Sequence, residues 1–274
     1  NLDGTAEQTA FSPSVMFSRE TFAIGQRTFS MPLVKAELFA GNVSLSDSVV
    51  PLPEAVTLTE GSHYYLEDLT TGLSHEIDEA ASTGTEITLE GSAPAALTRA
   101  AIREHQKLSQ LLPADLFSEG DRVLTFDATA NNFTANAVTE DSTWTRDMLS
   151  GKTSGLMIQI KEDSQEVTQL FTGQVTVKAQ PAVPGNTRLT GSGSAVEVSP
   201  ADLGLSETKG YRASAEATEA SRLRLWKADS EETASDYDQL YLSPTGWQRQ
   251  DAATSTDLTK EKLLHPFRAF FLLP

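Results

Sequence analysis

Short stretches of alternating apolar and polar residues run along most of the chain. Apolar side chains alternate through Phe22–Ile24 and again through Thr28–Leu33. His63–Leu69 and Leu73–Ile77 have the same character on either side of Thr70-Thr71-Gly72, which is typical of a turn between two antiparallel strands. Strands of this kind bury one face and leave the other in water. The pattern therefore predicts a mainly β protein.

One stretch has a different period. Apolar or boundary residues recur there at steps of three and four, as in an amphipathic helix, at Leu97, Ala101, His105, Leu108 and Leu112. Pro94 suits a first helical turn and Pro113 ends the run. We therefore expect one amphipathic helix here, covering an open end or face of a sheet, with His105 on its apolar stripe.

The second half of the chain contains an internal repeat. Matching pieces follow one another in the same order: Pro113–Leu116 and Pro200–Leu203, Arg122–Asp127 and Arg222–Lys227, Phe133–Val138 and Tyr237–Leu242, Trp144 and Trp247, Leu156–Ile160 and Phe267–Leu273. A unit this small cannot close its own core, so two copies should pack together or share strands. We expect 122–160 and 222–273 to have the same strand order, with the two tryptophans at equivalent places.

The length and the repeat together suggest how the chain is divided. A chain of 274 residues suits two domains of ordinary size. We predict two β-sandwich or partly closed barrel domains. The divisions are an N-terminal arm (1–14), a first β domain ending in the helix (15–112), and a second β domain (113–274) built from repeats at 113–180 and 200–274.

Composition narrows the functional classes. The net charge is −17, with 38 acidic and 21 basic residues, so phosphate-rich partners are repelled and we expect no nucleic-acid partner. Cysteine is absent, which excludes disulfides, thiolate nucleophiles and cysteine zinc sites. No apolar run reaches about 18 residues, so no transmembrane segment is expected. A Ser/Thr-rich, Lys-poor chain starting at Asn1 favours an exported protein, extracellular or at the cell surface after signal-peptide removal.

Motifs for catalysis or cofactor binding fail on inspection. Gly151-Lys152-Thr153 could end a phosphate-binding loop, but Arg146 stands where that loop requires glycine. His63 and His75 lie on the two arms of the predicted hairpin among carboxylates and could bind zinc. Two half-exposed strand histidines are the interpretation we prefer. We therefore predict no enzyme activity, no catalytic residue, no cofactor and no metal.

Three aromatic positions concentrate in the repeat: Trp144, Trp226 and Trp247. An exposed line of such rings could stack on sugars. Their matched places in the two copies favour a shared core role instead. A carbohydrate-binding or adhesive cell-surface module, with polysaccharide as its partner, remains the alternative function.

The N-terminal arm suggests how copies could associate. Residues 1–14 have too few apolar side chains to pack alone. We expect the arm to add as a strand to an open sheet edge of a neighbouring copy, with Phe11, Val15 and Phe17 in pockets of the acceptor. Pro13 would mark where the arm leaves its own domain. The sequence thus favours a self-assembling structural subunit of an extracellular filament or surface layer.

Several segments together resemble a known group of proteins. Phe29–Val43, Ile102–Leu112, Glu119-Gly120-Asp121 and the tryptophan-containing repeat are similar to an uncharacterised family of exported β-repeat proteins found in verrucomicrobial genomes. The closing 266–271 segment, Pro-Phe-Arg-Ala-Phe-Phe, is similar to final strands of Bacteroidetes-type surface proteins. These resemblances imply the cell surface and imply no catalytic residue.

Overall fold

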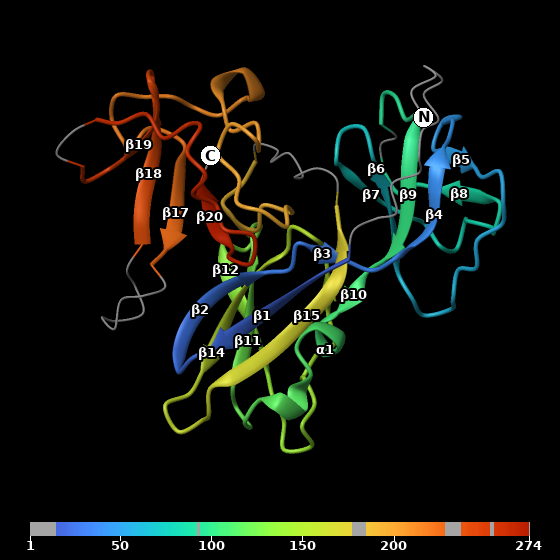
Figure 1. The fold of residues 1–274 in the computed structure, drawn as a ribbon, viewed down its shortest axis with the longest axis horizontal. Helices are drawn as coiled ribbons and strands as arrows, with labels where there is room; N and C mark the ends of the chain where they lie inside the picture. Colours follow the sequence, from blue (N-terminus) through green and yellow to red (C-terminus); the bar gives the residue numbers. More distant parts are fainter. Residues whose placement is uncertain (1–14, 92–93, 177–184, 228–236, 253–254, 274) are drawn as a thin grey trace, which may run out of the picture.

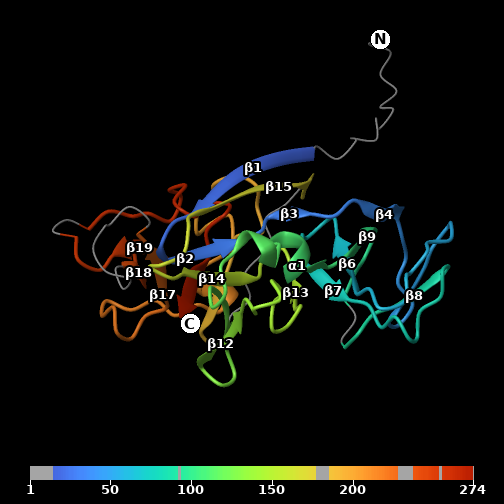
Figure 2. The ribbon, with the colours of Figure 1, turned by 90° about the horizontal axis from the view of Figure 1, so that it is seen from below.

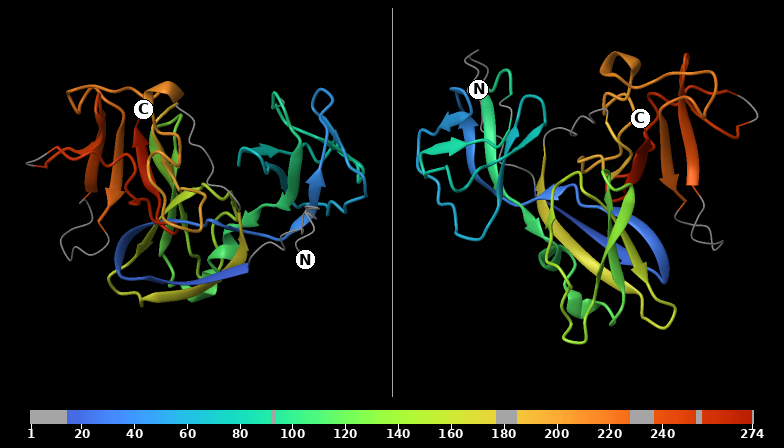
Figure 3. Two further views of the ribbon diagram at one scale, coloured as in Figure 1. Left: turned by 45° about the horizontal axis from the view of Figure 1, so that its top comes forward. Right: turned by 180° about the vertical axis from the view of Figure 1, so that it is seen from behind.

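The chain folds into three β units that lie in a row. The computed structural model describes residues 15–91, 94–176, 185–227, 237–252 and 255–273. Within those ranges there are twenty β-strands, one single-turn α-helix and two short 3-10 helices. The predicted mainly β fold is confirmed. Figure 1 shows a central unit with a smaller β unit on one side and the C-terminal sheet on the other, and Figure 3 shows the same order from two further directions.

The central unit is a sandwich of two antiparallel sheets. One sheet has the order β1-β15-β3, with bounds Val15–Phe22, Val167–Val175 and Leu33–Val34. The other has the order β12-β11-β14-β2, with bounds Asn132–Ala137, Arg122–Asp127, Gly155–Ile160 and Gly25–Ser30. Their inner faces meet in one core, where the rings of Phe22 and Phe29 pack edge to face with centroids 5.4 Å apart.

Several short elements cover one end of the sandwich. They are β10 (Gln106–Lys107), which pairs with β13 (Leu149–Ser150), the helix α1 (Leu108–Leu111) and the 3-10 helix η1 (Ala114–Leu116). Leu108, Leu111 and Leu112 are buried in the sandwich core. This end of the core is therefore closed by a single helical turn.

The smaller β unit is inserted between β3 and β10. A four-stranded sheet has the order β4-β9-β6-β7, with bounds Glu37–Asn42, Arg99–Glu104, Tyr64–Asp68 and Ser74–Glu76. A two-stranded ribbon joins β5 (Val49–Pro51) to β8 (Glu86–Thr88). The predicted hairpin is present as β6 and β7, and Gly72 supplies the positive φ of its turn. This unit, called the insert below, has its own hydrophobic core.

The predicted long amphipathic helix over 94–112 is wrong. Residues Arg99–Glu104 form β9, the strand that pairs with β4 on one side and β6 on the other. Ala100, Ala101, Ile102 and Arg103 are all buried, so burial there does not follow a helical stripe. A strand that is buried on both faces has apolar residues at successive positions, and the spacing of apolar residues in such a run does not distinguish a strand from a buried helix. Only Leu108–Leu111 is helical.

The C-terminal unit is a five-stranded antiparallel sheet. Its order is β16-β20-β17-β18-β19, with bounds Arg188–Thr190, Phe270–Leu273, Arg222–Trp226, Tyr237–Ser243 and Gly246–Arg249. The segment 198–213, which contains the 3-10 helix η2 (Glu207–Lys209), packs on its inner face through Val198, Leu203, Leu205 and Tyr211. The resulting core is separate from that of the sandwich.

The two copies of the predicted repeat have the same strand order in the structure, and their strand registers match as well. In the first copy β11 pairs with β12 and β14, and Arg122 lies opposite Ala137 and Gln159. In the second copy β17 pairs with β18 and β20, and Arg222 lies opposite Tyr241 and Leu273. The tryptophans are equivalent as well. Trp144 bridges to Val138, the residue after Ala137, and Trp247 pairs with Leu242, the residue after Tyr241.

The sheets divide the chain differently from the predicted boundary at residue 112. Strands β1 and β2 pair with β15 and β14, so residues from both sides of that boundary share both sheets of the sandwich. The insert, not the whole 15–112 stretch, forms the first separate core. Each sheet formed by the described residues has two edges, so none of them closes into a barrel.

The two copies of the repeat pack on each other through their outer faces. Phe126 and Phe133 of the first copy meet Phe271 of the second, with ring centroids 5.6 and 6.0 Å apart. The two sheets also approach closely at Gly155 in β14, where an added Cβ would lie 2.6 Å from the carbonyl carbon of Leu189 in β16. A side chain at residue 155 would therefore force the sheets apart.

We expect Gly155→Ala to lower the free energy of unfolding by about 1–3 kcal/mol, because the methyl group overpacks this contact. Gly185→Ala is the matched control, since a Cβ there meets nothing within 4 Å, and its effect should stay within about 0.5 kcal/mol. Urea unfolding of both variants measures the difference. Equal stabilities would mean that the sheets separate at residue 155 without cost.

Candidate functional site

Strand β1 ends its sheet and exposes large apolar side chains. Among the described residues it pairs on one side only, with β15. Val15 is 73% exposed and Phe17 is 75% exposed, and Leu170 on β15 is 56% exposed. Figure 2 shows β1 along the outer margin of the molecule, with β15 beside it. An edge strand carries a row of main-chain N–H and C=O groups that can pair with another strand.

The alternation of side chains explains this exposure. Phe22 and Glu20 point into the sandwich, so Val15, Phe17 and Arg19 point outward. The register of β1 and β15 places these residues of the two strands on the outward face: Val15, Phe17, Arg19, Thr21, Thr168, Leu170, Thr172 and Gln174. This face, called the β1 face below, contains no carboxylate, although the chain has a net charge of −17.

The C-terminal end of β1 is already occupied by a side chain. Arg27 forms an ion pair with Glu20 at 2.9 Å and also donates to the carbonyl oxygen of Thr21. Its guanidinium carbon lies 5.8 Å above the Phe22 ring. These contacts hold the strand against the sandwich, so the more accessible part of β1 is its first half.

A mainly apolar groove begins at the start of β1. It has a volume of about 490 Å³ and lies between the sandwich and the insert. Val15, Val34, Ala36 and Leu38 supply its apolar wall, and Lys35, Glu104 and Gln174 are among its polar residues. Leu38 is 45% exposed. The groove extends the apolar surface of the β1 face toward the insert.

The residues of the predicted assembly arm fall on both sides of the first described residue. Phe11 and Pro13 lie outside the described residues. Val15 and Phe17 lie in β1, which pairs with β15 of the same chain, and their side chains point outward. Of the predicted site residues, these two are the ones that the structure presents on an accessible surface.

The repeat tryptophans have other surroundings. Trp144 is 7% exposed and donates from Nε1 to the carbonyl of Leu112 at 2.6 Å, while Trp247 is fully buried and donates to the carbonyl of Leu205 at 2.8 Å. Trp226 is half-buried and packs edge to face on Tyr237. The first two indoles are core residues with satisfied N–H groups, and neither is available to stack on a sugar.

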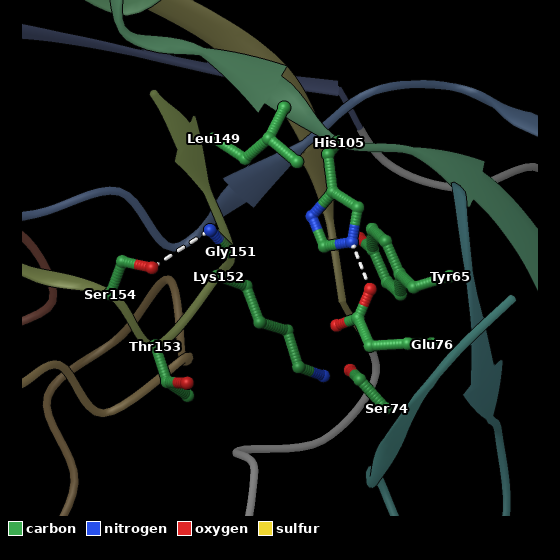
Figure 4. Close-up of a pocket in the computed structure, with 9 residues that line it drawn as sticks. All are labelled: Tyr65, Ser74, Glu76, His105, Leu149, Gly151, Lys152, Thr153 and Ser154. Atoms are coloured by element: carbon green, nitrogen blue, oxygen red, sulfur yellow. Dashed lines mark hydrogen bonds and ion pairs between the residues drawn. The ribbon is translucent and has the colours of Figure 1, made fainter. Parts of the chain in front are cut away.

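A second hollow lies between the insert and the sandwich. It has a volume of about 390 Å³. Figure 4 shows Tyr65, Ser74, Glu76 and His105 on the side of the insert and Leu149 and 151–154 on the side of the sandwich. The dashed line in Figure 4 joins His105 to Glu76, and the side chain of Lys152 extends into the same hollow. The insert and the 151–154 segment of the sandwich therefore share one polar junction.

A buried ion network forms the base of this junction. The Glu67 carboxylate accepts from Lys152 Nζ at 2.8 Å and from Arg103 Nε at 3.0 Å. Arg103 also pairs with Glu37 at 3.2 Å and donates to Gln174 of β15 at 2.6 Å. The side chains of Glu67 and Lys152 are only 2% and 1% exposed. Burial lowers the pKa of Lys152, and the Glu67 carboxylate opposes that shift.

A second polar pair lies at the wall of the hollow. His105 Nε2 and Glu76 Oε2 are 2.7 Å apart, and the Tyr65 ring lies 4.8 Å from the imidazole. Burial raises the pKa of Tyr65, and the nearby Glu67 charge adds to that shift. The His105–Glu76 pair lies on the insert side of the hollow, whereas the contacts from Lys152 to Glu67 and from Arg103 to Gln174 join the insert to the sandwich.

The other histidines do not come together. His75 lies opposite Leu66 in the hairpin, and His63 lies 3.7 Å from Glu79. Burial lowers the pKa of His75. Across the described ranges, no group of three or more His, Asp or Glu side chains is arranged to hold a metal ion.

The sequence motifs did not identify the junction residues by their role. Lys152 was examined as part of a phosphate loop, and Glu67 is 85 positions away from it. Arg103 was assigned to a helix. Val15 and Phe17, by contrast, were named from the sequence as apolar residues of the proposed assembly arm.

None of the helices in the described part of the chain is long and apolar enough to cross a membrane. The resemblance to exported β-repeat proteins stays a prediction. The chain matches no protein-family model, no curated protein and no solved structure.

Proposed function

We propose that this protein is a structural, non-catalytic subunit of an extracellular filament or surface layer. The observation that carries the proposal is the β1 edge, where an open strand, two highly exposed apolar side chains and a face without carboxylates coincide. Exposed apolar edges are normally avoided in monomers because they pair with other chains. Their presence favours a protein whose task is to associate.

The way in which the units are joined is consistent with a mechanical role. The junction network ties the insert to the sandwich through side chains that are almost completely buried. The two repeat copies are tied by an aromatic cluster and by the close approach at Gly155. Contacts of this kind restrict relative motion of the three units, which suits a subunit that must keep its shape within an assembly.

Assembly should depend on the β1 face. We expect the purified protein to form species larger than the monomer as its concentration rises, and Phe17→Lys to shift that transition to at least about tenfold higher concentration. The reason is that the substitution places a charge where an exposed ring would be buried on association. Light scattering after size exclusion, with negative-stain images of the concentrated protein, measures both effects.

The control is Val196→Lys, which introduces the same charge at another exposed apolar residue, 64% exposed and outside the β1 face. This variant should assemble like the unmodified protein. A strictly monomeric unmodified protein at every concentration would count against the proposed function. Equal effects of the two substitutions would show that net charge, not the β1 face, governs assembly.

A further inference from the structure

We propose that the partner of the β1 edge is a second copy of β1, paired antiparallel across a two-fold axis that passes beside Ser18. The inference deepens the proposed function and rests on it, because it names the occupant of the same edge. The two β1-β15-β3 sheets would then become one continuous sheet through both molecules. Such a contact is isologous, with the same surface used by each copy.

The geometry of β1 limits how two copies can meet. In an antiparallel pair, directly opposed residues point to the same face of the sheet. Outward residues must therefore oppose outward residues, so that Val15, Phe17 and Arg19 of one copy meet the same set in the other. The axis then passes beside one residue of β1, and each choice of residue defines a register.

Charge excludes the registers toward the C-terminal end of β1. An axis beside Arg19 would place the two Arg19 side chains directly opposite each other, and an axis beside Glu20 would do the same for two carboxylates. Like charges directly opposed across strands are destabilising. Glu20 is also held in the sandwich by Arg27, so it cannot turn away.

An axis beside Ser18 gives favourable pairs along the strand. Phe17 would lie opposite Arg19 of the second copy, and by symmetry Arg19 would lie opposite the second Phe17. A guanidinium beside an aromatic ring is attractive. Val15 would lie opposite Thr21, so the ladder would run from Val15 to Thr21. An axis beside Phe17 would give a ladder that stops at Arg19, with fewer main-chain hydrogen bonds.

The contact at Thr21 does not prevent this ladder. Arg27 donates to the carbonyl of Thr21, but a carbonyl oxygen has two lone pairs and can accept a second hydrogen bond. The outward face of both strands also lacks carboxylates, so two molecules of net charge −17 would meet at a face without opposed carboxylates. A second copy of β1 would therefore pair with the free main-chain groups of this edge, cover its exposed apolar side chains and bring no carboxylate to its outward face.

Engineered cysteine tests the register directly, because the chain has no cysteine of its own. Two residues opposed at the axis have Cα atoms about 4.5–5.5 Å apart, within the range of a disulfide. Ser18→Cys should therefore form a disulfide-linked dimer under mild oxidation. Thr172→Cys is the matched control: it is exposed on β15, and its two copies would be separated by three strand spacings, about 14 Å, which is too far.

We expect the Ser18→Cys dimer to form at least about tenfold faster than the Thr172→Cys dimer, since the paired strands raise the local thiol concentration. Adding Phe17→Lys to Ser18→Cys should remove that advantage, because the lysine would lie opposite Arg19 of the second copy. A second measurement uses the unmodified protein: hydrogen exchange at Val15–Thr21 should slow as the concentration rises. Equal cross-linking rates together with concentration-independent exchange would overturn the inference.

The outcomes separate this inference from the proposed function. An isologous contact closes into a dimer, so a filament or layer needs a further contact elsewhere. Large assemblies without Ser18→Cys cross-linking would overturn the β1 pairing and leave the structural role in place. Fast cross-linking of a protein that never grows beyond a dimer would support the β1 pairing and count against the filament or layer.

Discussion

Replacing Trp247 by alanine should lower the free energy of unfolding by about 3–5 kcal/mol, the usual cost of removing a fully buried large aromatic side chain. The indole is completely buried in the core of the C-terminal unit, and its Nε1 donates to the Leu205 carbonyl at 2.8 Å. The substitution therefore leaves a cavity and also a buried carbonyl without that donor. Urea unfolding followed by circular dichroism measures the loss.

The half-buried Trp226 provides the comparison within the same repeat. Its indole packs on Tyr237 at the interface between the two repeat sheets, so truncation exposes less new surface. Trp226→Ala should therefore cost clearly less than Trp247→Ala. If Trp247→Ala cost less than about 1 kcal/mol, the ring would not be the core residue that the structure describes.

The repeat could be predicted because its signal is local and occurs twice. Each copy places an arginine-led alternating strand, a second strand and a tryptophan in the same order, and both tryptophans found equivalent partners in Val138 and Leu242. Agreement between two stretches of sequence filters out accidental patterns. The strand order within each copy followed from that agreement, and so did the core position of the two tryptophans.

The course of β9 could not be predicted from the same kind of signal. Leu97, Ala101 and Leu108 are buried, as the helical pattern required, but so are Ala100, Ile102 and Arg103 between them. Pairing of β9 with β4 on one edge and β6 on the other determines its structure, although the spacing of its apolar residues also fits one face of a helix.

The pairing of the N-terminal strands is also a long-range effect. Thr21 and Thr168 contact each other although 147 positions separate them in the sequence. Nothing local to either strand indicates the partner, so the insert was joined to β1–β3 in the predicted division. The sequence marks Val15 and Phe17 as apolar residues near the N-terminus, whereas only the fold shows that they point outward from an edge strand.

The largest electrostatic effect is expected at Glu67. Glu67→Gln should lower the free energy of unfolding by about 3–5 kcal/mol, because Lys152 and Arg103 would remain buried without the carboxylate that both of them contact. Glutamine has nearly the same shape, so the loss would report charge and not volume. Urea unfolding at neutral pH measures the loss. Asp163→Asn, which breaks the exposed Lys161–Asp163 pair, should change stability by less than about 1 kcal/mol.

A double variant separates pairing from burial. Adding Lys152→Met to Glu67→Gln removes one of the two buried cations that lost the Glu67 carboxylate, so the double variant should recover part of the lost stability. Lys152→Met alone leaves Glu67 paired with Arg103 and should therefore lower the free energy of unfolding by less than Glu67→Gln does. Limited proteolysis should also cleave the Glu67→Gln variant faster near 105–107, where the chain passes from the insert to the sandwich. If the losses of the two single variants simply added, the buried charges would act independently, and the junction would owe its rigidity to packing alone.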